Sequence, residues 1–321
     1  MDKMLVMSAL ISFLITALAL KAIIPLLRKL KLGQRILEIG PSWHMQKQGT
    51  PTMGGIAFLA TAALVIIPYS FSDGKNDATL LLILAYCILS GLIGMLDDSR
   101  KLMKKQNEGL SAFSKFMLQL TLGCLFLILL RANGSIDTSV YIPFLRTRLD
   151  MGLLYYPFAL LMLTGFSNAV NLTDGLDGLC GSVTALVMLF FSAVSLSLDE
   201  RSVSLLSLSV LGICLGFLIY NLHPARVFMG DTGSLFLGAT VGAVSLVSSK
   251  GTLVLLVGII YLIETASVVI QVIGYKLTKK RIFLMAPIHH HLERKGMRES
   301  GITLLFSAVT LTMGVLCYIL G

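Results

Sequence analysis

Ten apolar stretches, most of them close to 20 residues long, constrain this chain more than any other feature of its sequence. They lie near 4–27, 53–71, 79–96, 112–131, 152–170, 178–198, 202–221, 232–249, 252–275 and 302–320. A helix of about 20 apolar residues crosses the hydrocarbon core of a bilayer. Hydrophobic residues make up 55% of the chain and charged residues 13%, which excludes a water-soluble protein with a polar exterior. We expect an all-α integral membrane protein with ten transmembrane helices in one domain, 1–321.

The basic residues are distributed unevenly between the two sets of loops. Most of the 26 Lys and Arg residues lie in the loops after the first, third, fifth, seventh and ninth stretches. The positive-inside rule makes these loops cytoplasmic, so ten spans place both termini outside the cytoplasm. All five histidines and the unusual acidic pairs lie in the same set of loops. The sequence therefore predicts a functional site on the cytoplasmic face of a membrane.

The starts of the second, fourth, sixth, eighth and tenth stretches are polar, and most of them contain glycine. A helix N-terminus presents unsatisfied N–H groups and a positive dipole end, which together bind anions. Five such starts on one basic face favour a substrate that carries phosphate. The net charge of +9 fits anionic substrates or anionic lipids. Residues that merely cap helices would explain any one of these starts alone.

Three carboxylates indicate metal-assisted chemistry. Asp97 and Asp98 lie at the expected C-terminal end of the third span, where the helix dipole disfavours negative charge. A positive group must offset them, and Lys101 and a divalent cation are both candidates, since Mg²⁺ commonly binds one or two carboxylates together with substrate phosphates. A solvated helix end with local salt bridges is the alternative. Asp231 is the expected N-cap of the eighth span, where it either caps the helix or holds a metal.

Two further loop segments are polar enough to bind a ligand. Asp174 and Asp177 repeat an Asp-Gly-Leu pattern, and the three-residue step predicts that both carboxylates share one face of a helical turn. The segment lacks the other oxygen ligands of a calcium loop, so it is interpreted as a polar cup or as a helix cap. Phe228 is an aromatic residue in a polar loop, where it either stacks on a base or fills a helix interface.

Histidines and one carboxylate complete the candidate residues. His289, His290 and His291 point in three directions on any regular backbone, which argues against a zinc site made from them alone. They suit phosphate binding or proton transfer near pH 7. Glu264 lies inside the ninth span, where an isolated carboxylate would cost about 2.5–3.5 kcal/mol. We expect it to face protein or a cavity, in a structural or substrate-lining role.

These motifs together resemble those of the bacterial phospho-N-acetylmuramoyl-pentapeptide transferases, a family within the polyprenyl-phosphate N-acetylhexosamine-1-phosphate transferases. The resemblance covers nearly the whole chain. It lies in six ordered motifs, which are Gly49 to Gly55, Asp97-Asp98, Asn171 to Gly178, Asn221 with His223-Pro224-Ala225, Met229 to Ser234, and Pro287 to His291.

The resemblance implies an activity and a setting. Such enzymes transfer phospho-MurNAc-pentapeptide from UDP-MurNAc-pentapeptide to undecaprenyl phosphate, which gives lipid I and UMP, with Mg²⁺ as cofactor. This is the first membrane step of peptidoglycan synthesis, at the cytoplasmic face of the bacterial cytoplasmic membrane. The family also implies a homodimer and a bent ninth helix. Nothing in the sequence indicates a nucleic acid as partner.

The resemblance assigns roles by position. It implies catalytic roles for Asp97, Asp98, Asp231 and His289, with Mg²⁺ on Asp231 and either Asp97 or Asp98 as a second ligand. Asp98 is the candidate base that deprotonates the lipid phosphate, and a covalent aspartyl intermediate is the alternative. The implied substrate-binding residues are Lys47, Thr52, Lys101, Lys115, Asn171, Asp174, Gly175, Leu176, Asp177, Asn221, Phe228, His290 and His291.

Two other functions compete with this one. The sister class transfers GlcNAc-1-phosphate to a polyprenyl phosphate, and the triple histidine with Lys295 to Ser300 favours the muramoyl-pentapeptide family instead. A lipid or solute transporter would have ionisable residues along the membrane midplane and internal repeats. Only Glu264 lies deep in a span, and the sequence contains no evident repeat.

Overall fold

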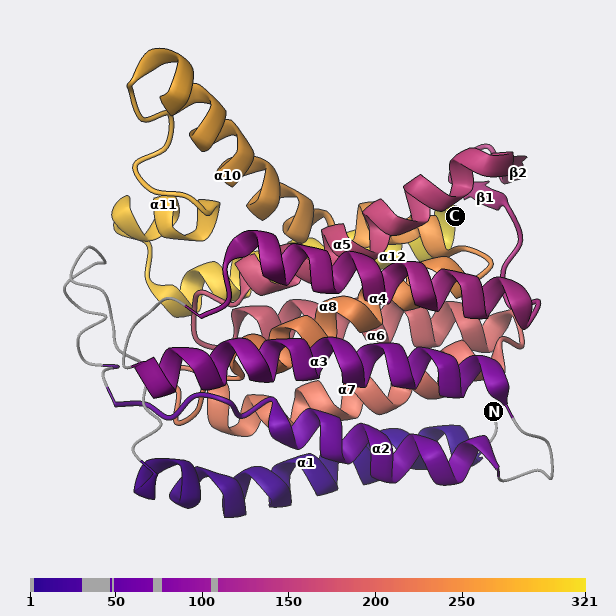
Figure 1. Ribbon diagram of the computed structural model, residues 1–321, viewed down its shortest axis with the longest axis horizontal. Helices are drawn as coiled ribbons and strands as arrows, with labels where there is room; N and C mark the ends of the chain where they lie inside the picture. Colours follow the sequence, from indigo (N-terminus) through magenta and orange to yellow (C-terminus); the bar gives the residue numbers. More distant parts are fainter. Residues whose placement is uncertain (1–2, 31–46, 48, 72–76, 105–108) are drawn as a thin grey trace.

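The computed structural model describes residues 3–30, 47, 49–71, 77–104 and 109–321, which form a bundle of helices (Figure 1). Nine helices among these residues are long and apolar enough to cross a membrane. They are α1 (Lys3–Lys29), α3 (Ala78–Lys104), α4 (Ala112–Ala132), α5 (Tyr155–Thr173), α6 (Leu179–Ser197), α7 (Arg201–Asn221), α8 (Gly230–Val247), α10 (Ile259–Thr278) and α12 (Glu299–Leu320).

The tenth expected span is represented by a shorter helix. α2 (Ile56–Ser70) has 15 residues, about 22 Å of helix, against a hydrocarbon core of about 30 Å. The preceding segment from Pro51 to Gly55 does not continue this helix, because its backbone is bonded to residues 228 and 229 instead. The expected span 178–198, which starts with small and polar residues, is confirmed as α6.

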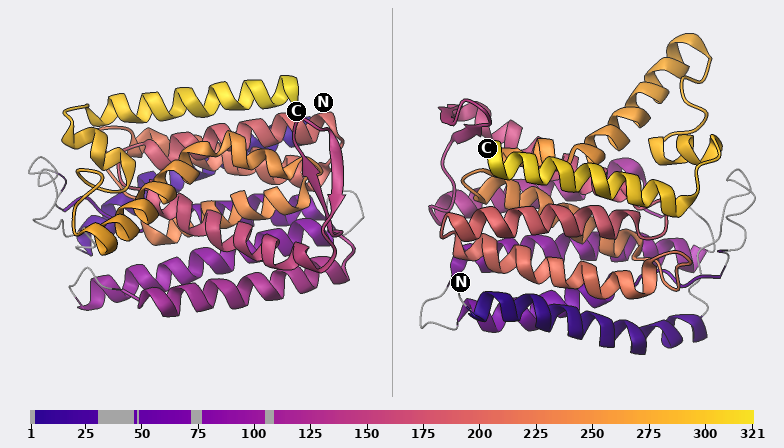
Figure 2. Two further views of the ribbon diagram at one scale, coloured as in Figure 1. Left: turned by 90° about the horizontal axis from the view of Figure 1, so that it is seen from above. Right: turned by 180° about the vertical axis from the view of Figure 1, so that it is seen from behind.

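The bundle has two distinct ends. α12 finishes beside a short β-hairpin, and α1 starts at the same end of the bundle, which we call the hairpin end (Figures 1 and 2). At the opposite end α2, α4, α6, α8 and α12 begin, and we call it the site end. The two termini of the described chain therefore share one end of the bundle.

The described residues confirm the all-α class, and the only strands among them form one short hairpin between α4 and α5. β1 (Ser139–Ile142) pairs antiparallel with β2 (Thr147–Asp150), in a register that places Tyr141 opposite Arg148. The Tyr141 hydroxyl donates a hydrogen bond of 3.0 Å to the Gly321 carbonyl. The hairpin thus fastens the last residue of the chain to the connection between α4 and α5. Four-residue strands in a polar connection are too short to give a distinct hydrophobic alternation.

Small residues allow the inner helices to pack closely. α6, α7 and α8 are the most buried of the spanning helices. A Cβ atom on Gly238 of α8 would lie 2.6 Å from the Ser167 Cα of α5, and one on Gly216 of α7 would lie 2.7 Å from the Phe13 carbonyl oxygen of α1. Such close approach is the usual basis of helix association in membranes. It fixes the position of α8, whose first turn carries the site.

The expected ninth span, 252–275, is broken. It consists of a 3₁₀ turn (Gly251–Leu253), α9 (Val254–Val257) and α10. α9 and α10 meet at Gly258. α10 and the short α11 (Ile288–Arg294) lean away from the bundle (Figure 1). The bend that the resemblance implied is therefore present. A second 3₁₀ turn (Gly152–Leu154) precedes α5.

Candidate active site

Three carboxylates from two distant segments meet at the site end. Each of Asp97, Asp98 and Asp231 has an oxygen within 4.8 Å of an oxygen of the others. Gly94 makes this possible, because a Cβ atom there would lie 2.6 Å from the Thr232 amide nitrogen and collide with α8. α3 also continues to Lys104, eight residues beyond its expected end, so the two carboxylates lie inside a helix and not at its terminus.

Asp98 is bound to the first turn of α8. Its Oδ1 accepts a hydrogen bond of 3.1 Å from the Asp231 amide. Its Oδ2 accepts bonds of 2.9 Å from the Thr232 amide and 2.7 Å from the Thr232 hydroxyl. The N-cap position itself is Met229, so the expectation that Asp231 is the N-cap was wrong. Asp98 supplies the negative charge that a helix N-terminus favours.

Asp231 is surrounded by positive and polar groups. The Lys101 Nζ lies 2.9 Å, and the Lys115 Nζ 2.8 Å, from Asp231 Oδ2, while the Asn171 amide donates to Oδ1 at 2.8 Å. Lys101 also lies 2.7 Å from Asp97 Oδ2. Lys101, one of the two candidates for offsetting the acidic pair, contacts Asp97 of that pair and also Asp231.

The donor set of this cluster fits a divalent cation. Two of its three carboxylates are buried and the third is half-buried, and carboxylate oxygens are the ligands that Mg²⁺ prefers. Asp97 is held in place from its other side, since its Oδ1 accepts a bond of 2.6 Å from the Leu110 amide. A substrate phosphate would find two ammonium groups and the start of α8 beside the same carboxylates.

The two aspartates of the repeated Asp-Gly-Leu pattern diverge, which corrects the expectation that they share a helical face. α5 ends at Thr173, and the chain turns through residues 174–178 into α6, with Gly178 at a φ of +75°. Asp177 is almost fully buried. Its carboxylate contacts the Lys47 Nζ at 2.7 Å and accepts from the Ala225 amide at 3.0 Å. It therefore belongs to a second cluster.

This second cluster contains Asp177, His223 and Glu299, and it encloses Lys47. Lys47 and Glu299 form an ion pair, and the His223 Nδ1 lies 3.1 Å from Asp177 and 3.4 Å from Glu299. Nearby, Asn221 accepts from the Gly178 amide at 3.0 Å and donates to the Val227 carbonyl at 2.9 Å. Asn221 is buried, and both of these hydrogen bonds join it to the backbone of its own chain.

Thr52 and Phe228 lie on two loops that are bonded to each other. The Gly54 amide donates to the Phe228 carbonyl and the Phe228 amide to the Pro51 carbonyl, both at 2.9 Å. Thr52 is buried beside Gly230. A Cβ atom added to Gly230 would lie 3.0 Å from the Thr52 hydroxyl. Phe228 is half-buried. Both residues are thus next to the start of α8.

The three histidines of α11 have three different surroundings, as predicted. His289 is buried, with its ring against Gly175 and its Nδ1 3.0 Å from Glu264 Oε1. The His290 Nδ1 lies 2.7 Å from Glu293. The Leu284 amide donates to the His291 Nδ1 at 3.1 Å. His289 contacts the turn after α5 at Gly175, and the side chain of Leu176 in this turn is buried. His44 lies outside the described residues.

Comparison with known proteins decides the family. The pattern of glycosyl transferase family 4 matches residues 80–249, and signature 1 of the phospho-N-acetylmuramoyl-pentapeptide-transferases matches residues 47–59. The chain belongs to this transferase family. It is 44% identical to the phospho-N-acetylmuramoyl-pentapeptide-transferase of Clostridium perfringens (strain 13 / Type A), over 99% of this chain and 98% of that one.

Other members of the family are 41–44% identical over nearly their full length. The enzyme of Carboxydothermus hydrogenoformans is 44% identical, over 96% of each chain. The enzyme of Listeria monocytogenes serotype 4b is 41% identical, over 96% of this chain and 95% of that one. The chain is therefore a multi-pass membrane enzyme of the transferase family, as the six motifs indicated.

Asp174 lies between the two clusters and carries an unusual carboxyl group. Its pKa is raised from 3.8 to about 8, first because it is withdrawn from water and then because Asp231, Asp98 and Asp177 repel its charge. No hydrogen-bond partner of its carboxyl group lies among the described residues.

Replacing Asp174 by Asn is expected to stabilise the empty protein, and to do so more strongly at pH 8.5 than at pH 5. Because the pKa is higher in the folded than in the unfolded state, the free energy of unfolding falls as the pH rises from about 4 to about 8. The Asn side chain does not ionise, so the free energy of unfolding of the variant lacks this decrease. Thermal denaturation in detergent at the two pH values measures the effect, with the exposed Asp199→Asn as the control. Equal pH dependence of the wild type and Asp174→Asn would contradict it.

Glu299 and His223 are the cluster residues for which sequence reasoning proposed no role. Glu299 begins α12 and lies within the segment from Lys295 to Ser300 that helped to identify the family, but nothing in that segment singles it out. His223 lies in the motif with Asn221. Their role depends on α7, α12 and Lys47 meeting at one point, which only the folded chain shows.

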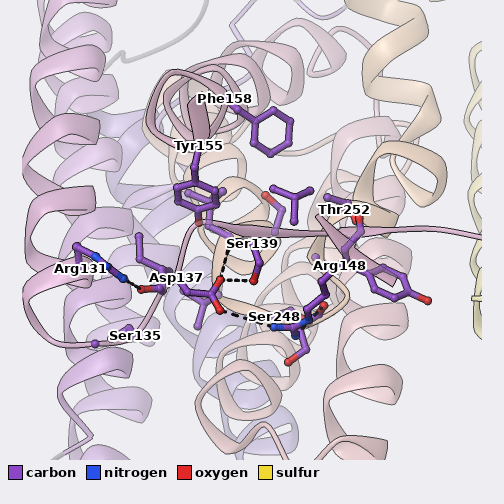
Figure 3. A pocket seen from close by; sticks show the side chains of 18 residues that line it. Arg131, Ser135, Asp137, Ser139, Arg148, Tyr155, Phe158, Ser248 and Thr252 are labelled. Atoms are coloured by element: carbon purple, nitrogen blue, oxygen red, sulfur yellow. Dashed lines mark hydrogen bonds and ion pairs between the residues drawn. The ribbon is translucent and has the colours of Figure 1, made fainter. Parts of the chain in front are cut away.

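A cavity of about 330 Å³ lies at the hairpin end, away from both clusters. Arg131, Asp137, Arg148, Tyr155 and Thr252 are among its lining residues (Figure 3). None of the residues that line it was a predicted site residue. Its polar groups largely bond to one another, as when Asp137 accepts bonds from the Ser139 amide and hydroxyl. The candidate active site of this transferase is therefore the site end.

Proposed function

We propose that the site end is where the chain carries out its family's reaction. In this reaction UDP-MurNAc-pentapeptide and undecaprenyl phosphate give lipid I and UMP. The observation that carries the proposal is the meeting of Asp97, Asp98 and Asp231 with two lysines at the start of α8. The identity of 41–44% to phospho-N-acetylmuramoyl-pentapeptide-transferases supports it.

The reaction joins an oxygen of the lipid phosphate to the phosphorus that bears the sugar. The bond from that phosphorus to the oxygen of UMP breaks, and UMP leaves with the electron pair. Such transfers need charge stabilisation and alignment more than covalent assistance from the protein. Lys101 and Lys115 would bind the phosphate oxygens, and the N–H groups at the start of α8 would face the same charge.

Asp231 and Asp97 would hold Mg²⁺, which neutralises pyrophosphate charge when bound. Asn171 orients Asp231, since its amide donates both to Asp231 Oδ1 and to the Ser234 hydroxyl. Asp98 keeps the first turn of α8 in place through three hydrogen bonds. If Asp98 is also the base of the reaction, it would have to exchange these bonds for the lipid phosphate.

We further propose ten crossings, with α2 as the short one, termini outside the cytoplasm and the site end inside it. The common end of α1 and α12 supports an even number of crossings (Figure 1). The concentration of Lys and Arg in the loops of the site end supports the orientation. Labelling single cysteines in the hairpin and in the α10–α11 loop of intact cells, with a reagent that does not cross membranes, tests it. Assembly as a homodimer is proposed from the family alone.

The uridine part of the substrate would bind among Phe228, Thr52, Asp174 and Lys47. Replacing Phe228 by Ala is expected to raise the KM for UDP-MurNAc-pentapeptide by about tenfold, since base stacking on an aromatic ring contributes about 1–3 kcal/mol. The KM for undecaprenyl phosphate should not change. A fall in thermal stability with unchanged KM values would show that Phe228 only fills a helix interface.

The proposed reaction is tested directly by UMP release. The detergent-purified protein receives undecaprenyl phosphate with either UDP-MurNAc-pentapeptide or UDP-GlcNAc, with Mg²⁺ or with a chelator. We expect release only with the first nucleotide and only with Mg²⁺. Release with UDP-GlcNAc alone would assign the protein to the sister activity.

A further inference from the structure

A carboxylate of α10 and an imidazole of α11 form a buried pair beside the turn that follows α5. Glu264 has no exposed surface, and His289 is 1% exposed. The Glu264 Oε1 and the His289 Nδ1 are 3.0 Å apart. The two residues come from the two helices that lean away from the bundle (Figure 1). The pair therefore joins these helices at a point that water does not reach.

Neither side chain makes a well-aligned hydrogen bond with any other described residue. The carboxylate oxygens of Glu264 and both ring nitrogens of His289 are buried without such a bond. The approach of the two groups is close enough for an ion pair, although its angles are not those of a hydrogen bond. A buried carboxyl group without a partner is costly. Among the described residues, each group consequently has the other as its available partner.

The other side of the imidazole faces the turn that follows α5. A Cβ atom on Gly175 would lie 2.7 Å from the His289 Cε1 and would also collide with Nε2. Gly175 adjoins Asp174 and is separated by one residue from Asp177, so the ring lies at the turn that connects the two clusters. Glycine is required at this position because any side chain would displace the ring. The two nitrogens therefore have distinct surroundings, Nδ1 toward Glu264 and Nε2 toward the turn.

We propose that Glu264 is a positioning residue for His289. By accepting the Nδ1 proton, Glu264 fixes the orientation of the ring and leaves Nε2 as the nitrogen that meets the nucleotide substrate at the Asp174–Gly175 turn. A group bound to one ring nitrogen of a histidine determines the proton and direction of the other. The inference rests on the proposed function, because Nε2 has a task only if the substrate binds at this turn.

The variant Glu264→Gln tests the proposal, because it keeps the size of the side chain and removes the carboxylate. We expect kcat/KM for UDP-MurNAc-pentapeptide to fall by roughly tenfold or more, as for other residues that orient a functional histidine. Glu264→Asp should restore part of the loss. Ser267→Ala is the matched control, since Ser267 is buried on α10 and bonds to the Glu264 backbone without reaching His289. It should retain wild-type kinetics.

Two measurements separate positioning from a merely structural role. The ¹⁵N resonances of His289, assigned with His289→Asn, should show a protonated Nδ1 in the wild type and should shift in Glu264→Gln. In the His289→Asn background, Glu264→Gln should cause no further loss of nucleotide binding, since coupled residues are not additive. The wild-type spectrum decides even if Glu264→Gln does not fold.

Three results would overturn the proposal. They are an unprotonated His289 Nδ1 in the wild type, unchanged kinetics and histidine resonances in a folded Glu264→Gln protein, and full additivity in the double variant. The proposed reaction has a separate test, because it fails if the wild type releases no UMP from UDP-MurNAc-pentapeptide.

Discussion

Replacing Asp231 by Asn is expected to reduce kcat by a factor of about a thousand or more while the protein still folds. Asp231 is the carboxylate that both lysines contact, at 2.9 and 2.8 Å, and it is the only one of the three acidic residues that lies on α8. Removing a group that stabilises transition-state charge commonly costs a factor of about 100 to 1,000, and losing the metal as well adds to that loss.

The folding of the Asp231→Asn variant is expected because the amide is nearly the same size and can still contact Asn171. Its two lysines, however, lose one partner, so the response to Mg²⁺ is the sharper readout. In the wild type, Mg²⁺ should raise the thermal stability in detergent, and in Asp231→Asn it should not. Asp199→Asn is the matched control, because Asp199 is exposed and has a φ of +54°, which Asn tolerates. Wild-type turnover by Asp231→Asn would remove the acidic cluster from the reaction.

The sequence predicts the helices well because their signal is local. Each apolar stretch reports its own length, and nine of the ten correspond to helices long enough to cross a membrane. The break at Gly258 was implied by the resemblance but not by the apolar pattern, since hydropathy does not detect a bend. The hairpin of residues 139–150 was missed because its four-residue strands are too short to give a hydrophobic alternation, and its contacts with Thr252 and the end of α12 join residues far apart in the sequence.

The site was predictable as a set of residues but not as an arrangement. Spacing placed Asp174 and Asp177 on one helical face, whereas the turn at Gly178 directs Asp177 toward Lys47 and leaves Asp174 between the clusters. The interaction of Asp98 with the α8 amides spans 133 positions. No local pattern reports which of two adjacent aspartates faces a lysine and which faces a helix start. The close approach at Gly94 decides that, and it exists only in the packed bundle.

Asp98→Asn is expected to lower both turnover and stability. Sequence reasoning alone predicts that this variant loses turnover without losing stability, since it regards Asp98 as a chemical group. In the structure both carboxylate oxygens accept backbone N–H groups, Oδ1 from Asp231 and Oδ2 from Thr232. An Asn side chain has only one oxygen, so in either orientation its NH₂ group faces one of these amides.

The variant should therefore leave one N–H group of α8 without an acceptor and weaken the favourable charge at the helix start. The loss of a helix cap or of one partner in a buried hydrogen bond costs about 1–2 kcal/mol. Asp97→Asn is the matched comparison, because the one oxygen of its side chain can still accept from the Leu110 amide while Lys101 keeps Asp231 as partner. Denaturation in detergent should show Asp98→Asn to be less stable than Asp97→Asn. If both variants lose turnover with equal, unchanged stability, the hydrogen bonds to α8 contribute little and Asp98 acts chemically alone.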